Sequence, residues 1–86
     1  MTTWHTELTA AFERHGETWA DVVKHTMSDS ELHREFDDGY GGEEGCAFTL
    51  WTRKRVYFPA CYDGSEWVAS VPRRPCKEAT SHVGGG

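Results

Sequence analysis

The 86-residue chain lacks most of the features that mark membrane, secreted or metal-binding proteins. No apolar run approaches the roughly 20 residues of a membrane span, and the amino terminus lacks the basic-then-apolar pattern of a signal peptide. Three cysteines cannot all pair within one chain, so we expect reduced thiols in a cytoplasmic protein. Neither these cysteines nor the five histidines form the close pairs that bind structural zinc, so we predict no metal and no other cofactor.

The sequence also lacks a grouping of side chains that would carry catalysis. The segment 39–42 offers a glycine-rich phosphate loop, but acidic residues surround it and no predicted strand precedes it. Cys46 and Cys61 fall in predicted strands, where cysteine is commonly a small hydrophobic residue. The acidic pairs at 37–38 and 43–44 lie on a glycine-rich loop that water can solvate. We therefore predict a protein without enzymatic activity.

Each half of the chain is poor in charges of one sign. Residues 7–44 hold 11 of the 14 acidic residues against three basic ones, which is −8 by count. Residues 46–86 hold three acidic and six basic residues, which is +3. Such an uneven distribution creates a field that steers association with a partner, so it favours a binding role over a reaction.

What the chain does have is aromatic residues: four Trp, three Tyr and four Phe. A domain of this size buries only about 60% of its unfolded surface, and aromatic side chains supply a large buried area per residue. We predict one α+β domain over residues 1–75 and a flexible tail over residues 76–86.

Helical periodicity and start signals occupy the first part of that domain, residues 3–36. The apolar spacing predicts a helix over 3–15 that ends before Gly16. Thr18 with Asp21 is a capping-box pattern and predicts a second helix from 19 to 25 or 26.

A second capping box, formed by Ser28 and Glu31, predicts a short third helix over 29–36. The glycine-rich, acidic segment 37–45 that follows must be a loop.

Beyond residue 45 the sequence pattern changes to that of strands. The segments 46–51, 56–62 and 66–71 are rich in β-branched and aromatic residues and form a predicted meander over 46–72. Asp63-Gly64 is a strong signal for a type I′ hairpin turn. It pairs Tyr62 with Ser65, Ala60 with Trp67, Phe58 with Ala69 and Val56 with Val71.

That register puts an apolar set on one face of the sheet, which we expect to be covered: Val56, Phe58, Ala60, Trp67, Ala69 and Val71. Tyr57 and Val68 would then lie on the outer face. A two-residue turn at Arg53-Lys54 would place Phe48 and Leu50 on the face opposite the apolar set, so we predict a turn of three or five residues with Arg53, Lys54 and Arg55 solvated at its tip. Pro59 cannot donate a hydrogen bond, so the pairing with the first strand should be interrupted near Phe48. The predicted fold is two or three short helices packed on one face of a three-stranded antiparallel meander.

Two surfaces are candidates for binding a partner. The acidic surface consists of Glu31, Glu35, Asp37, Asp38, Glu43 and Glu44. Carboxylates at this density resemble the phosphates of a nucleic acid and suit a groove lined by Lys and Arg on another protein. The alternative is a face that serves solubility alone.

The other surface joins aromatic and basic residues: Trp51, Arg53, Lys54, Arg55, Tyr57, Arg73 and Arg74. Aromatic rings among cations suit nucleobase stacking and phosphate contact, and they also make protein–protein hot spots. Because the net charge is −5, we expect a protein partner rather than direct contact with nucleic acid. In the structural alternative, the helix over 3–15 covers Trp51 and Tyr57.

The three terminal glycines suggest a further alternative. Ubiquitin-like and sulfur-carrier proteins use a terminal Gly-Gly, but their fold begins with a β-hairpin, and this chain is predicted to begin with helices. A flexible end is the simpler interpretation.

In size, acidity, reduced cysteines and predicted α+β build, the chain resembles the small inhibitors made by bacteriophages and mobile elements, anti-CRISPR proteins in particular. Those proteins share no motif, so the resemblance assigns no residue. It implies a non-enzymatic inhibitor in the host cytoplasm, monomeric or homodimeric, that binds a subunit of a nucleic-acid-processing complex. It would fill a basic groove with the acidic loop or clamp a subunit with the aromatic face. The alternative is a small nucleic-acid-binding regulator that uses the basic strands.

Overall fold

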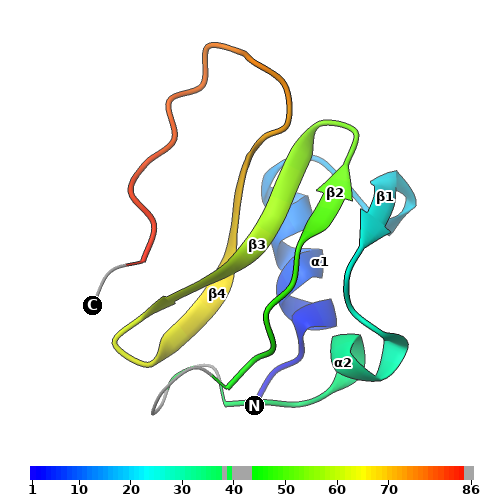
Figure 1. Cartoon of the computed structure of the whole chain (residues 1–86), viewed down its shortest axis with the longest axis vertical. Coiled ribbons are helices and arrows are strands. Elements are labelled where there is room, and N and C mark those ends of the chain that lie inside the picture. Colours follow the sequence, from blue (N-terminus) through cyan, green and yellow to red (C-terminus); the bar gives the residue numbers. More distant parts are fainter. Residues whose placement is uncertain (38, 40–43, 85–86) are drawn as a thin grey trace.

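The computed structural model describes residues 1–37, 39 and 44–84, and within them the chain has an α+β fold (Figure 1). One antiparallel sheet has the strand order β1 (Val22–His25), β2 (Leu50–Thr52), β3 (Arg55–Tyr62) and β4 (Ser65–Pro72). Helix α1 (Trp4–Arg14) packs behind the sheet, and α2 (Asp29–His33) lies beside the end of β1. The predicted α+β class is confirmed and the two helices lie within the predicted two or three, but the sheet has four strands rather than three.

Helix α1 follows the sequence pattern closely. The Thr3 hydroxyl accepts a hydrogen bond from the Thr6 amide at 3.1 Å and caps the first turn. One face of the helix buries Trp4, Leu8 and Phe12. The helix stops before Gly16, whose φ of +68° lies in the left-handed region that glycine adopts without strain, as predicted.

The predicted second helix is wrong beyond its first turn. Thr18 and Asp21 do form both bonds of a capping box, but the turn they begin is a single 3-10 turn, Trp19–Asp21. The next residues form β1, which pairs with β2 through an irregular register between Val22 and Lys24. Two adjacent β-branched valines favour an extended chain, and the partner strand supplies backbone hydrogen bonds that a short helix would have to make alone.

Helix α2 begins at the predicted cap and ends early. The Ser28 hydroxyl accepts from the Glu31 amide at 3.1 Å, and the Glu31 carboxylate accepts from the Ser28 amide at 2.8 Å. The helix ends at His33 rather than Phe36. Phe36 instead pairs with Thr2, each amide donating to the other residue's carbonyl at 2.9 Å. This bridge supplies the backbone partners that another helical turn would have supplied.

The β3–β4 hairpin has the predicted register at all four predicted pairs. Asp63 has a φ of +50° and Gly64 a φ of +84°, which is the pair of left-handed residues that a type I′ turn requires.

The turn between β2 and β3 is shorter than predicted. Two residues, Arg53 and Lys54, connect the strands. The Thr52 hydroxyl oxygen accepts from the Lys54 amide at 3.2 Å and from the Arg55 amide at 2.9 Å, so a side chain stabilises a turn without left-handed residues. β2 also starts at Leu50 rather than at residue 46, because the ladder stops before Pro59, as the missing N–H predicts.

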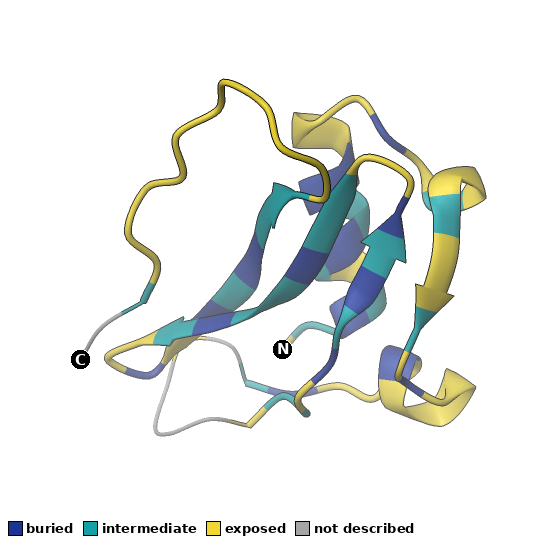
Figure 2. Cartoon of the chain, turned by 45° about the horizontal axis from the view of Figure 1, so that its top comes forward, coloured by how far each residue is buried: buried dark blue, intermediate teal, exposed yellow. Residues whose placement is uncertain are grey.

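The short turn decides which face of the sheet is covered. Leu50 pairs with Tyr57, and both side chains are fully buried beneath α1 together with Phe12 and Val68. The predicted outward face at Tyr57 and Val68 is therefore the inner face. The opposite face carries Val56, Phe58, Ala60, Trp67, Ala69 and Val71, of which the two alanines are buried and the others partly exposed. Figure 2 shows buried residues on α1 and the central strands and exposed ones along the tail and α2.

Candidate functional site

The cations of the second half gather where the β2–β3 turn meets the end of β4. We call this region the basic end, and it consists of Arg53, Lys54, Arg55, Arg73 and Arg74. The Arg73 amide donates to the Lys54 carbonyl at 2.8 Å, and the Arg73 guanidinium donates to the Thr52 carbonyl at 3.0 Å. These bonds fix the two cationic segments side by side.

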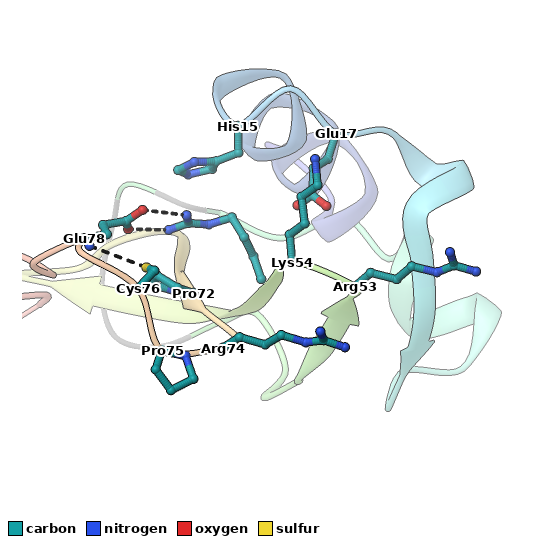
Figure 3. A pocket seen from close by; sticks show the side chains of 10 residues that line it. His15, Glu17, Arg53, Lys54, Pro72, Arg74, Pro75, Cys76 and Glu78 are labelled. Atoms are coloured by element: carbon teal, nitrogen blue, oxygen red, sulfur yellow. Dashed lines mark hydrogen bonds and ion pairs between the residues drawn. The ribbon is translucent and has the colours of Figure 1, made fainter.

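A pocket of about 550 Å³ opens at the basic end (Figure 3). His15 and Glu17 line it from the end of α1, and residues of the tail close the other side. Lys54 points toward Glu17, whereas Arg53 and Arg74 extend away from the tail. Arg53 and Arg74 therefore line the pocket and also extend the cationic surface beyond it.

The deep part of the pocket holds a buried carboxylate. Glu17 is 5% exposed and accepts a hydrogen bond from the Tyr57 hydroxyl at 2.6 Å. The Thr52 hydroxyl has one proton to donate, either to Glu17 at 3.2 Å or to the Arg55 carbonyl at 3.3 Å. Burial, followed by the hydrogen bond to Glu17, raises the pKa of Tyr57 well above its ordinary value. The phenol therefore remains a proton donor at neutral pH.

The rim of the pocket carries an ion pair. Arg55 donates from Nη1 and Nη2 to the two carboxylate oxygens of Glu78 at 3.0 and 2.9 Å. The hydrogen bond to Glu78 raises the pKa of Arg55, and the same bond lowers the pKa of Glu78. Burial, then the charges of Arg55 and Arg14, lower the pKa of His15 below 6.5. The imidazole is accordingly mostly neutral at pH 7.

Beside the pocket, Trp51 is partly exposed. A hollow of about 300 Å³ is lined by Trp51, Val23, Lys24 and Arg73. An aromatic ring with cations nearby can stack a planar ring and contact a phosphate.

The structure brings together most of the predicted aromatic and basic surface. The members at or beside the basic end are Trp51, Arg53, Lys54, Arg55, Arg73 and Arg74. Tyr57 is not among them, because its side chain is in the core. Arg55 is not a solvated tip residue, since its side chain is 11% exposed and paired.

The predicted acidic surface is described only in part, because Asp38 and Glu43 lie outside the described residues. Glu31 and Asp37 serve local structure: Glu31 caps α2, and Asp37 accepts from the Gly39 amide at 3.1 Å. Glu35 and Glu44 are exposed. Within the described ranges, none of these four carboxylates forms an ion pair with Lys or Arg.

Sequence reasoning missed two buried carboxylates, Glu17 and Glu66. Glu66 is 6% exposed and accepts from the Glu44 amide at 2.8 Å and from the Gly45 amide at 3.1 Å. The hairpin register puts Glu66 on the same face as Val68, which was predicted to face outward, so the sequence contained no sign of this burial. Nothing around Glu17 in the sequence distinguishes it from a surface glutamate.

Comparisons with protein-family models, with curated proteins and with solved structures found no match. Across the described ranges, no cluster of three His, Cys, Asp or Glu side chains is arranged to hold a metal ion. None of the helices in that part of the chain has the length and apolar character needed to span a membrane. The end of the tail packs on the sheet: a Cβ at Gly84 would lie 3.0 Å from the Cys61 carbonyl.

Proposed function

We propose that the protein is a small, non-enzymatic regulator of a nucleic-acid-processing complex and that its basic end contacts the nucleic acid. The observation that carries the proposal is the hollow at Trp51, which Lys24 and Arg73 flank. A base can stack on the indole while the neighbouring cations neutralise backbone phosphates. Arg53 and Arg74 extend the cationic surface from the adjoining segments.

The net charge of −5 does not oppose this mode of binding, because the charges are separated in space. α2 and its exposed carboxylates lie at the opposite end of the sheet from the β2–β3 turn (Figure 1). A dipolar molecule of this kind approaches a polyanion with its cationic end first. Its acidic end then points away from the nucleic acid, toward any basic protein bound nearby.

The direct test is the affinity for a fluorescent single-stranded oligonucleotide with hydroxyl ends, measured by anisotropy at several salt concentrations. Reversal of one cation, Arg53→Glu, should weaken binding about tenfold or more and make the salt dependence shallower. Trp51→Ala should weaken binding by the loss of one stacked base, a similar factor.

The matched control is Arg34→Glu, the same charge change at an exposed arginine beside α2. It should bind like the wild type once circular dichroism shows that the fold is kept. Equal losses in both arginine variants would mean that only net charge matters, and the proposal would then be wrong.

A second candidate function, the anti-CRISPR-like inhibitor, is favoured by the exposed carboxylates at the acidic end. The carboxylates of Glu35 and Glu44 form no ion pair with Lys or Arg in the described part of the chain, where the Arg34 guanidinium donates only to the Glu44 carbonyl, so their charge is available to another molecule. They would dock into a Lys/Arg-lined groove that otherwise holds nucleic acid.

Its test replaces Glu35 and Glu44 together by Lys and leaves the capping residue Glu31 in place. Capture of proteins from a bacterial host, quantified by mass spectrometry, should lose a nucleic-acid-binding subunit with this variant and keep it with Arg53→Glu. The reverse pattern favours the basic-end proposal.

A further inference from the structure

The outer edge of the Arg55 guanidinium is occupied by a carboxylate from the tail. Its two terminal nitrogens donate to the two oxygens of Glu78 at 3.0 and 2.9 Å. Arginine binds carboxylates and phosphates alike through such parallel pairs of bonds. The Glu78 carboxylate therefore marks a position that an oxyanion can fill.

The position of this guanidinium does not depend on Glu78. Arg55 Nε donates to the Ser70 hydroxyl at 2.9 Å, and Nη2 lies 3.5 Å from the Ser70 carbonyl. The Arg55 side chain is only 11% exposed. Because β4 holds it from behind, its outer edge remains directed into the pocket when Glu78 leaves.

The tail, in contrast, is held lightly. Glu78 belongs to a segment without helix or strand, and its side chain is 44% exposed. Within the described part of the tail, residues 74–84, the hydrogen bonds to the sheet are those of Glu78 to Arg55. Because the Glu78 side chain is partly exposed and no other hydrogen bond in this described segment reaches the sheet, an external oxyanion can replace the carboxylate.

The surrounding pocket has both room and charge for such an anion. Its volume is about 550 Å³, and the cations Lys54, Arg53 and Arg74 line it together with Arg55. The carboxylate of Glu17 also lines it but is engaged by the Tyr57 hydroxyl at 2.6 Å. A phosphate monoester carries up to two negative charges and three acceptor oxygens, so it competes well against one carboxylate.

We propose that Arg55 is the centre of a binding site for a phosphate monoester, and that Glu78 occupies this site as an internal competitor. The proposal does not depend on the proposed function, which rests on the hollow lined by Trp51, Lys24 and Arg73 and needs no terminal phosphate.

The test is a titration of the protein with inorganic phosphate, followed by NMR at the backbone amides of Lys54 and Ser70, which are present in every variant. Glu78→Gln removes the competing charge, so it should bind phosphate roughly tenfold more tightly than the wild type, a change of about 1.4 kcal/mol. Arg55→Gln in the Glu78→Gln background should return the affinity to the wild-type level or below. Glu35→Gln, the same charge change at the acidic end, should leave the affinity unchanged.

If Glu78→Gln binds phosphate no more tightly than Glu35→Gln does, the proposal is wrong. It is also wrong if tight phosphate binding persists in the variant that lacks Arg55. A tail that loosens in Glu78→Gln without a gain in phosphate affinity would show a purely structural ion pair and would also overturn it.

Oligonucleotides with a 5′-phosphate or a 5′-hydroxyl then distinguish the sources of the phosphate. Tighter binding of the 5′-phosphate strand than of the 5′-hydroxyl strand assigns the site to a strand terminus. Equal affinity for the two strands, with inorganic phosphate still bound at Arg55, assigns it to a free phosphate.

Discussion

Glu17 and Glu66 are buried carboxylates near opposite ends of the sheet, and they are satisfied by different kinds of donor. Glu17 accepts from the hydroxyl of Tyr57, with that of Thr52 within reach. Glu66 accepts from the backbone amides of Glu44 and Gly45. Hydroxyl groups rotate and can find other acceptors, whereas an amide is fixed to the path of its chain. Glu66 therefore shapes a loop, while Glu17 adjusts the polarity of a pocket.

The difference separates the roles of the two ends. Substitution of Glu66 removes the acceptor that holds the amides of the loop before β2. Substitution of Glu17 alters the charge of the pocket and leaves the strands in register. Three predictions, given in order of decreasing effect, test this difference between the two ends.

The largest effect is expected at Gly45. A Cβ there would lie 2.5 Å from Cζ2 of Trp4, whose ring is 1% exposed and has no room to move. Gly45→Ala should lower the free energy of unfolding by about 3 kcal/mol in urea denaturation, as overpacking does. Gly39→Ala is the matched control, since nothing lies within 4 Å of its Cβ, and it should change stability little. A Gly45→Ala protein as stable as this control would show that the loop is not fixed against Trp4.

The two carboxylates can be compared directly by the same substitution. Glu66→Gln should cost about 2 kcal/mol, because two fixed amides lose a charged acceptor. Glu17→Gln should cost about 1 kcal/mol, because the hydroxyl groups can reorient. Both are measured by urea denaturation at pH 7, and equal costs or a larger cost at Glu17 would contradict the proposed difference.

The smallest effect is a pH dependence confined to the basic end. The pKa of His15 is lowered in the folded protein, chiefly by burial, so below about pH 6.5 the unfolded chain binds this proton more readily than the folded one. Stability should therefore decline as the pH falls from about 7.5 to about 5. His15→Gln should remove that part of the decline.

Chemical shifts recorded by NMR over the same pH range localise the effect. They should move at Ser70, whose hydroxyl lies 3.3 Å from His15 Nε2, and not at Gly45. A titration that reaches Gly45 equally would show that the two ends are coupled.

The sequence predicted the parts of the fold that local signals specify. The Asp63-Gly64 turn set the register of β3 and β4, and the cap at Ser28 set the start of α2. β1 was missed because four residues of strand depend on a distant partner, and a capping pattern at Thr18 is equally compatible with one turn of helix.

The covered face of the sheet was predicted wrongly for a related reason. Both faces of β3 are apolar, so hydrophobicity alone does not choose between them. Polar contacts distinguish the inner face: Tyr57 reaches Glu17 across 40 residues of sequence. The cations of the candidate site were visible in the sequence, but Glu78, 23 residues from Arg55, was not. Contacts between residues this far apart in the sequence produce no periodic pattern that sequence analysis can detect.

The turn at Arg53 and Lys54 affects how strongly the basic end binds a ligand. The Thr52 hydroxyl oxygen accepts hydrogen bonds from the Lys54 and Arg55 amides. The backbone that carries Arg53 and Lys54 is therefore ordered before a ligand binds. A ligand then immobilises side chains alone and spares the entropy of arranging a loop. The longer turn that the hydrophobic pattern predicted would carry the same charges. It would bind the same ligand more weakly, because its backbone would lose conformational entropy on binding.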